Sequence, residues 1–263
     1  MEEDRREHVW SNEDTSPGAS GIMKTLKELH EATHYRPDAL VMGKNLTLGD
    51  KKDAEVRKDA EQQAARLHNY VLDNHSLKSV DKDAIADYSR GSSVLNRHLS
   101  GTWHGIDTMD AGSIRRYDDF HKRMFTALGK IGPLPETVHT YSGICSNRAS
   151  EYAKLEPGDI AHSQAYTSTS LNAGTATSFG TMEHYAHFII PAGEHHGGYV
   201  APWSHHPGEM EYTIKAGSSW KYLGSHSFLR YNRPRVLHSF APAGSSIIRP
   251  EGDTIGGLLG KSV

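Results

Sequence analysis

Cysteine is almost absent from this chain of 263 residues, which contains Cys145 alone. A single thiol excludes an intramolecular disulfide framework and is typical of proteins from a reducing compartment. No apolar run is long enough to span a bilayer, and the first residues contain no charged-then-apolar signal segment. We therefore expect neither a membrane anchor nor a disulfide-linked partner.

A strong excess of one charge is also missing. The chain has 29 basic and 32 acidic residues, so its formal net charge is −3. This balance argues against a general polyanion-binding surface. Hydrophobic residues make up 36% of the chain, and the mean hydropathy is −0.62. These values predict a polar, soluble protein with a modest core.

The chain divides into segments that differ in composition and in the periodicity of their apolar residues. Residues 1–22 are acidic, contain Ser, Gly and Pro without periodicity, and are predicted to be a disordered tail or leader. We expect a helical extension over 23–77, a main domain over 78–250 and a flexible tail over 251–263. The extension contains a predicted helix near 50–72, and the pattern leaves open whether it packs on the main domain. Its apolar stripe, at spacings of three and four, consists of Ala60, Ala64, Leu67 and Val71.

Helices precede strands along the main domain. Two short helices are predicted over 79–87 and 94–99 with an interruption at 89–93, and an amphipathic helix over 114–128 ends near Gly132. Short apolar or alternating runs follow, which favours an α+β fold over a parallel α/β fold. These predicted strands cover 137–144, 160–170, 185–190, 198–203, 211–216, 220–223 and 235–240, with a short helix near 171–180.

Two carboxylates stand two positions apart at the start of one predicted strand. In the run Gly208-Glu209-Met210-Glu211-Tyr212, Glu209 and Glu211 are expected to point the same way, because side chains of a strand alternate faces. Two like charges side by side cost free energy unless a cation uses them. Most Glu-x-Glu pairs are only the solvated face of an edge strand. Here an aromatic loop with Tyr199 and Trp203 precedes the pair and favours a functional interpretation.

Two hydroxyl-containing segments end earlier predicted strands. In Tyr166-Thr167-Ser168-Thr169-Ser170, Ser168 and Ser170 would share a face from which they could orient a carboxylate or a ribose hydroxyl. In Thr140-Tyr141-Ser142-Gly143, a small residue followed by glycine permits close approach of a ligand to the backbone. Each segment alone is more typical of an ordinary edge strand or turn.

The three segments, taken in this order, resemble the motifs of the ADP-ribosyltransferases of the Arg-Ser-Glu type, most of all the Alt-like enzymes of tailed phages. Those enzymes have a strand ending in Tyr-Arg-Gly, a Ser-Thr-Ser strand, and a Glu-x-Glu strand after a recognition loop. Residues 84–99 are similar to the family's N-terminal helices, and 187–193 to a following strand and turn. The likeness covers 78–245 and implies N-terminal helices followed by a mainly antiparallel split β-sheet.

The resemblance implies an NAD-dependent mono-ADP-ribosyltransferase that modifies arginine on bacterial host proteins without a metal. Glu211 would stabilise an oxocarbenium ion of the ribose, Ser168 would orient Glu211, and Glu209 would polarise the attacking arginine. The residues implied to bind NAD are Tyr141, Ser142, Gly143, Arg148, Tyr166, Thr169, Ser170 and Phe179, and those implied to contact the acceptor are Tyr199 and Trp203.

One position departs from the family pattern, because Ser142 stands where the family has Arg. That arginine holds the NAD phosphates through charge-assisted hydrogen bonds, and serine lacks its charge. Arg148 or Arg97 would have to supply the missing charge. The alternative to an active enzyme is therefore a weak or inactive transferase-fold module that serves as a virion structural or binding protein.

The phage likeness also predicts where the protein acts. Leu26-Lys27-Glu28 and Leu29-His30-Glu31 are similar to tripeptides cut by phage head-maturation proteases, although such tripeptides are common. We expect a protein of the virion head that acts in the host cytoplasm. NAD-capped RNA is an alternative to NAD as the donor.

The histidine pairs at 195–196 and 205–206 raise a further alternative, a metal site. Adjacent histidines of an extended chain point to opposite faces, so neither pair chelates a metal alone. A site would need one histidine from each pair together with Glu194 or Glu209. We expect no metal at this position.

Overall fold

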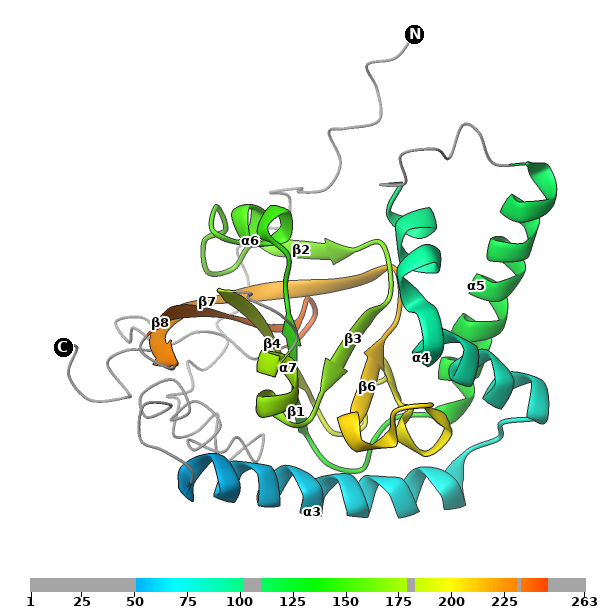
Figure 1. Ribbon diagram of the computed structural model, residues 1–263, viewed down its shortest axis with the longest axis horizontal. Coiled ribbons are helices and arrows are strands. Elements are labelled where there is room, and N and C mark those ends of the chain that lie inside the picture. The colour runs from blue at the N-terminus through cyan, green and yellow to red at the C-terminus, as the bar shows by residue number, and fades with distance from the viewer. Residues whose placement is uncertain (1–50, 102–109, 179–182, 231–232, 246–263) are drawn as a thin grey trace, which may run out of the picture.

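The computed structural model describes residues 51–101, 110–178, 183–230 and 233–245. Within these residues, three helices come first and an eight-stranded sheet follows, with short helices in its connections (Figure 1). This arrangement confirms the predicted α+β fold. None of the helices among these residues has an apolar stretch of membrane-spanning length. The tails predicted at 1–22 and 251–263 lie outside the described residues.

α3 (Lys51–Asn74) shares one core with the sheet rather than forming a separate arm. It carries the predicted apolar stripe, in which Leu67 and Val71 are completely buried. Each such side chain stabilises the docked helix by roughly 1.5–3 kcal/mol. Arg66 adds a forked ion pair to Glu136, with N–O distances of 3.2 and 3.0 Å. In Figure 1 the helix runs beneath the lower end of the sheet.

α4 (Ser79–Ser100) and α5 (Ala111–Ile131) pack against each other. α4 breaks at Gly91, whose φ of −165° and ψ of 62° are not helical, and this break confirms the interruption predicted at 89–93. In the first turn, Asp81 accepts a hydrogen bond from the Lys78 backbone N–H at 2.7 Å and pairs with Lys130 Nζ at 2.7 Å. The start of α4 is thereby tied to the end of α5.

The sheet has the strand order β2-β7-β8-β4-β1-β3-β6-β5. β4 and β8 are parallel, and the other neighbouring pairs are antiparallel. β1 and β3 meet at one register pair, Tyr141 with Ser170. The sheet therefore divides there into a five-stranded and a three-stranded part, as the predicted split sheet requires. The strands are β1 (Val138–Gly143), β2 (Ile160–Ser163), β3 (Thr167–Ser170), β4 (His184–Ile190), β5 (Gly197–Tyr199), β6 (Glu211–Ile214), β7 (Ser218–Arg230) and β8 (Arg233–Pro242).

Short helices fill several connections of the sheet. α7 (Ala173–Ser178) agrees with the helix predicted near 171–180. α6 (Ser146–Tyr152) was not predicted, because its seven residues are too few to show an amphipathic period. The strand predicted over 198–203 ends early, at Tyr199, and two 3₁₀ turns follow it along the chain. These turns are η2 (Ala201–Trp203) and η3 (Pro207–Glu209).

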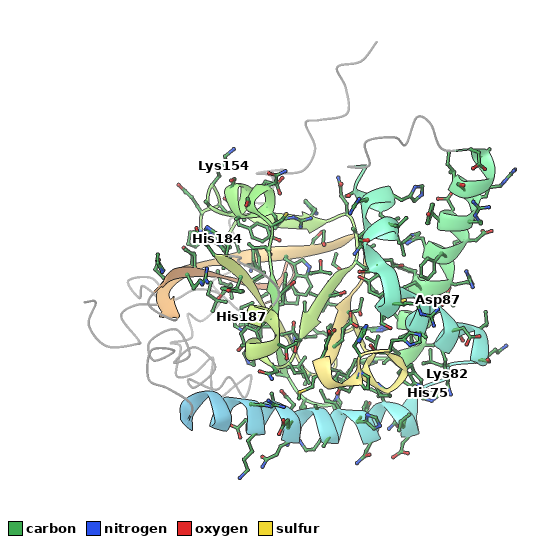
Figure 2. The ribbon with its side chains drawn as sticks, viewed as in Figure 1. His75, Lys82, Asp87, Lys154, His184 and His187 are labelled. Atoms are coloured by element: carbon green, nitrogen blue, oxygen red, sulfur yellow. The ribbon has the colours of Figure 1, made fainter. Side chains whose placement is uncertain are left out.

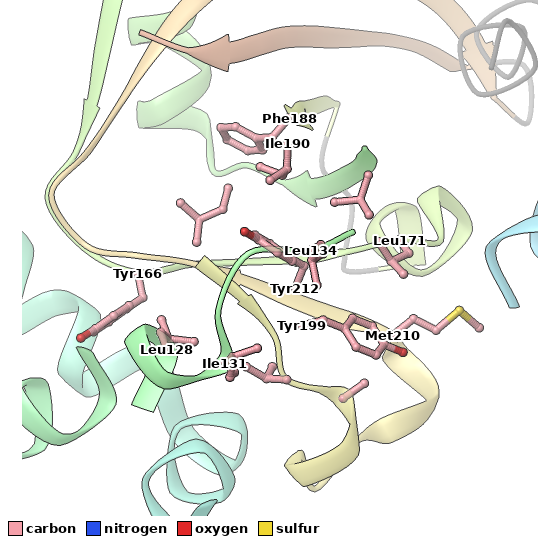
Figure 3. Close-up of a cluster of buried hydrophobic side chains, with 14 of the residues drawn as sticks. Leu128, Ile131, Leu134, Tyr166, Leu171, Phe188, Ile190, Tyr199, Met210 and Tyr212 are labelled. Carbon is pink, nitrogen blue, oxygen red and sulfur yellow. The ribbon is translucent and has the colours of Figure 1, made fainter. Parts of the chain in front are cut away.

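The main core lies between α5 and the three-stranded part of the sheet, where Leu128 and Ile131 lie near Tyr199 and Tyr212 (Figure 3). Gly198 of β5 permits this approach, because a Cβ there would lie 2.6 Å from Ile131 Cδ1. A side chain there would force Ile131 to shift, so glycine lets the helix lie close to the strand. The rigid packing holds β5 and its neighbour β6 in place.

Candidate active site

A cavity of about 210 Å³ opens where the sheet divides. β1 contributes one side, β3 and β6 the other, and α7 and the end of η3 complete the lining. The three segments singled out in the sequence therefore meet at one place. The lining residues are Tyr141, Ser142, Gly143, Ser168, Thr169, Ser170, Thr175, Ala176, Glu209 and Glu211.

Glu211 is the first residue of β6, and its side chain is buried, with 5% of its surface exposed. Burial raises the pKa of Glu211, and the nearby charge of Glu209 raises it further. Hydrogen bonds from Ser168 and Thr213 and the proximity of His206 act in the opposite direction. Thr213 Oγ1 donates to Glu211 Oε1 at 3.0 Å. The carboxylate is thus held by two hydroxyls in a place where water is mostly excluded.

Glu209 reaches the cavity by a different route from the one predicted. It ends η3 and does not belong to β6, and the following Met210 has a left-handed backbone with φ of 51°. The alternation of the strand therefore does not extend back to Glu209, and the prediction of two carboxylates on one strand was wrong. The turn nevertheless brings both carboxylates to one cavity. Glu209 is half-buried, whereas Glu211 is buried.

The β3 serines hold the two glutamates separately. Ser168 pairs in register with Thr213, and Ser170 pairs with Glu211, so both serines share a face with the carboxylate of Glu211. Ser170 Oγ donates to the backbone carbonyl of Glu209 at 2.5 Å. The hydroxyl of the intervening Thr169 bonds instead to the Tyr212 carbonyl. This arrangement agrees with the prediction that Ser168 and Ser170 point the same way.

Tyr141 supplies the inner wall of the cavity from β1. Its ring stacks on His187 with centroids 5.0 Å apart and an interplanar angle of 15°. Burial raises the pKa of Tyr141, and its hydroxyl has no hydrogen-bond partner among the residues that the structure describes. A buried hydroxyl without a partner is costly, so this atom is suited to receive a polar ligand group. Ser142 and Gly143 continue the wall.

The described lining of the cavity contains no lysine, arginine or histidine. Arg148 lies on α6, where its guanidinium donates to the Tyr152 hydroxyl at 3.4 Å and lies 3.8 Å from Glu151. Arg97 is exposed on α4. Neither of the two arginines proposed to replace the family cation is part of the lining.

Three other predicted contact residues lie away from the cavity. Tyr166 is buried, and its hydroxyl contacts His121 of α5 at 3.0 Å. Tyr199 is 2% exposed in β5, so its ring belongs to the core and cannot meet an acceptor protein. Trp203 in η2 packs edge-on against His75, with centroids 5.0 Å apart. Figure 2 labels His75, which directly follows α3. Phe179 lies outside the described residues.

Sequence reasoning missed Tyr88 of α4, whose hydroxyl lies 3.2 Å from Ser168 Oγ. It also missed Thr213, which bonds to Glu211, and the two α7 residues of the lining, Thr175 and Ala176. Thr213 could have been found, because it stands two positions after Glu211 and shares its face. No local pattern marks Tyr88, because its contact depends on how α4 docks on the sheet.

The histidine pairs have separate surroundings. His196 Nε2 lies 2.6 Å from Glu194, while the ring of His195 contacts the Leu128 carbonyl at 2.9 Å. His205 Nε2 lies 2.7 Å from the Arg90 guanidinium. Within the described part of the chain, no three possible metal ligands gather at one point.

Comparisons with known proteins agree with this geometry. Residues 60–228 match the family described as ADP-ribosyltransferase exoenzyme, whereas a comparison with curated proteins gives no match. Among solved structures, the fold is similar to Plx2a, an ADP-ribosyltransferase toxin from Paenibacillus larvae. That match has 21% identity and a TM-score of 0.57, and it covers 71% of this chain and 96% of Plx2a.

Two further structures were solved with small molecules. C3stau2 from S. aureus, solved with NAD, is 17% identical with a TM-score of 0.55, over 68% of this chain and 94% of its own. The ADP-ribosyltransferase Vis from Vibrio splendidus, in complex with agmatine, is 18% identical with a TM-score of 0.54, over 78% of this chain and 92% of its own. These likenesses show the fold, and the family match spans more than half of the chain. The chain therefore belongs to the ADP-ribosyltransferase exoenzyme family.

Proposed function

We propose that this protein transfers ADP-ribose from NAD to arginine side chains of a protein acceptor. The observation that carries the proposal is the pair of unlike carboxylates on one cavity, with Glu211 buried and Glu209 half-buried. Family membership supports an NAD-dependent transferase. The different surroundings of the two glutamates support two separate roles in one reaction.

Glu211 is suited to the ribose. When the bond between ribose C1′ and the nicotinamide nitrogen breaks, nicotinamide leaves with the electron pair and the sugar becomes an oxocarbenium ion. A carboxylate held in a water-poor site stabilises such a cation more strongly than it would in water. The hydroxyls of Ser168 and Thr213 fix the carboxylate before the charge develops.

Glu209 is suited to the acceptor. Its carboxylate is more accessible than that of Glu211, and its backbone is fixed by Ser170. A guanidinium pairs with a carboxylate through two parallel hydrogen bonds, which would bring an arginine nitrogen toward C1′ and accept its proton as the new C–N bond forms. The agmatine bound in Vis carries a guanidinium of this kind.

The volume of the cavity suits one end of the NAD donor rather than the whole molecule. At about 210 Å³ it is smaller than the roughly 300–1,000 Å³ typical of pockets for drug-sized ligands. We assign the nicotinamide–ribose end to it, with Tyr141 and Gly143 on the inner wall.

The absence of a basic side chain from the described lining favours a second candidate, a weak or inactive transferase-fold module that serves as a virion structural or binding protein.

The biological setting stays a prediction. We propose an Alt-like, phage-encoded protein of the virion head that modifies bacterial host proteins after reaching the host cytoplasm. NAD-capped RNA stays an alternative donor. The motif order supports this placement within the family, while the acceptor remains defined only by its chemistry, an accessible arginine.

Incubation with labelled NAD and a bacterial lysate tests the proposal directly. We expect the wild-type protein to label acceptors on arginine, as located by mass spectrometry, and Glu211→Gln to label none while keeping its circular dichroism spectrum. Equal labelling by both proteins would refute the role of Glu211. If NAD raises the melting temperature without any labelling or hydrolysis, the binding-module candidate is supported instead.

A further inference from the structure

We propose that Tyr88 of α4 is a positioning residue that sets the hydroxyl of Ser168 toward Glu211. This inference rests on the role proposed above for Glu211 and adds a helix of the N-terminal half to the site. Tyr88 is 1% exposed, and its hydroxyl lies 3.2 Å from Ser168 Oγ. Tyr88 is not itself one of the described lining residues, whereas Ser168 is, so Tyr88 would act on Glu211 through the serine.

The Tyr88 hydroxyl has the hydrogen-bond partners Asn96, Ser92 and Ser168, and these bonds permit one consistent direction toward Glu211. Asn96 Nδ2 donates to the Tyr88 hydroxyl at 3.2 Å, which occupies an acceptor site of that oxygen. The single proton of the hydroxyl can then point to Ser168 Oγ. With its oxygen accepting from Tyr88, Ser168 directs its own proton to Glu211. The order from donor to acceptor is therefore Asn96, Tyr88, Ser168 and Glu211.

The break in α4 makes this order possible. Tyr88 and Asn96 are eight positions apart, and in an unbroken α-helix their backbones would be separated by about 12 Å along the axis. Gly91 lies between them with a non-helical backbone. The break therefore allows Asn96 Nδ2 and the Tyr88 hydroxyl to meet at 3.2 Å, next to Ser168 of β3.

The ring of Tyr88 is held in place by its neighbours. Tyr166 packs against it edge to face, with centroids 5.5 Å apart and an interplanar angle of 70°. The hydroxyl of Tyr166 is itself anchored on α5 by His121. This packing links α4, α5 and the residue just before β3, and it leaves the Tyr88 hydroxyl little freedom to leave Ser168.

The electrostatics agree with a neutral donor. Burial raises the pKa of Tyr88, and the nearby charge of Glu211 raises it further, so the phenol keeps its proton in the neutral range. The groups that face Glu211 are Ser168 and Thr213 as donors, Glu209 as a like charge, and His206 as the nearby imidazole. Loss of the Ser168 bond would therefore leave Glu211 easier to protonate.

The test compares Tyr88→Phe, Ser168→Ala and the double variant in NAD hydrolysis as a function of pH. We expect Tyr88→Phe to lower kcat by roughly tenfold, with KM for NAD little changed, because a single oriented hydrogen bond is lost. The pH below which kcat falls should move upward, because Glu211 loses the bond that favours its charged form. Ser168→Ala should move it in the same way, and the double variant should add nothing further.

Tyr222→Phe is the matched control. Tyr222 lies on β7 outside the described lining of the cavity, and the variant removes another buried tyrosine hydroxyl, which contacts the imidazole of His238 at 3.1 Å. Its pH profile should match that of the wild type. If Tyr88→Phe does not fold, Asn96→Ala is expected to move the profile in the same direction by a smaller amount.

Two results would overturn the inference, namely an unmoved pH profile in Tyr88→Phe or additive losses in the double variant. A wild-type protein that never cleaves NAD would instead contradict the proposed function. In that case the link between Tyr88 and Ser168 is tested by the melting temperatures of the wild type, Tyr88→Phe, Ser168→Ala and the double variant. Losses smaller than the sum of the single variants support the link, and additive losses exclude it.

Discussion

Ser170 Oγ donates a hydrogen bond to the backbone carbonyl of Glu209, across a distance of 2.5 Å. Ser170 also accepts a hydrogen bond from the Asn172 backbone N–H at 3.0 Å. One hydroxyl thus connects the end of β3 to the end of η3, where Met210 takes a left-handed backbone. Glu209 is positioned through its main chain, and its side chain keeps freedom to meet an acceptor.

Glu209→Gln should separate the two halves of the reaction. The amide keeps the shape of the side chain but cannot pair with a guanidinium or take its proton. We expect NAD hydrolysis to stay within about threefold of the wild type and transfer to agmatine to fall by at least about a hundredfold, a typical loss for a removed general base. Both rates can be measured from release of labelled nicotinamide and formation of ADP-ribosyl-agmatine.

The matched control for this prediction is Glu156→Gln. Glu156 is an exposed carboxylate in the connection between α6 and β2, outside the lining of the cavity. Its replacement makes the same change in charge and should leave both rates unaltered. A parallel loss of hydrolysis and transfer in Glu209→Gln would show that Glu209 acts on the ribose instead.

Glu211→Gln should stabilise the fold above neutral pH while it removes activity. Burial raises the pKa of Glu211 in the folded protein, so folding favours the neutral acid. The stability contributed by this group is therefore lost as pH rises from its unfolded pKa, about 4.3, through its folded pKa. Glutamine avoids this loss, so the melting temperature of Glu211→Gln should exceed that of the wild type at pH 8.

The pH dependence provides the check on that prediction. Below pH 4 the carboxyl is protonated in both the folded and the unfolded chain, so the advantage of the glutamine should shrink there. Melting curves of both proteins across this range measure the difference. A variant that is less stable than the wild type at pH 8 would mean that the bonds from Ser168 and Thr213 outweigh the cost of burying the charge.

Ser142→Arg should strengthen the binding of NAD. Ser142 lines the cavity, and its hydroxyl makes a long hydrogen bond, 3.3 Å, to the Gly143 carbonyl. A guanidinium there would form charge-assisted bonds to the donor phosphates. We expect KM for NAD to fall by roughly tenfold, which corresponds to about 1.4 kcal/mol of binding free energy. Ser146→Arg, on the exposed start of α6, adds the same charge outside the cavity and should leave KM unchanged.

The sequence predicted the parts of the site that follow from local periodicity. Ser168 and Ser170 share a face because β3 is a regular strand. The order of the motifs predicted that they would lie near Glu211, and β3 pairs with β6 in that register. The position of Glu209 followed from a turn that the sequence does not reveal, since Met210 is a non-glycine residue with positive φ. The two carboxylates meet for a reason other than strand alternation.

The positions of residues that depend on packing between distant segments could not be predicted from the sequence. Tyr199 follows two glycines and looks like part of an exposed loop, but the approach of α5 to Gly198 buries it. Tyr88 and Ser168 are 80 positions apart and meet only because the folded chain brings α4 next to β3. The presence of a helix or a strand can be predicted from the local pattern of residues. Contacts between distant residues depend on how these elements pack in the core.

Asp81→Asn should destabilise the docking of α4 on α5. Burial acts to raise the pKa of Asp81, but the hydrogen bonds and charges of Lys130 and Lys78 outweigh it and hold the pKa below its usual value. Asparagine can still accept from the Lys78 backbone N–H, so the variant removes the ion pair and keeps the cap. Asp81 is buried, but the Lys130 side chain is 30% exposed and can be solvated, so the expected loss in the free energy of unfolding at pH 7 is about 1.5 kcal/mol.

The pH dependence of this loss distinguishes the ion pair from simple misfit. A depressed folded pKa contributes stability above the unfolded pKa, about 3.9, that disappears as pH falls through the folded value. The difference between wild type and Asp81→Asn in urea unfolding should therefore be large at pH 7 and shrink toward pH 3. Asp83→Asn, an exposed neighbour in the same turn, should change stability by no more than about 0.5 kcal/mol. A loss that stays constant with pH would assign the effect of Asp81→Asn to packing rather than to the pairing with Lys130.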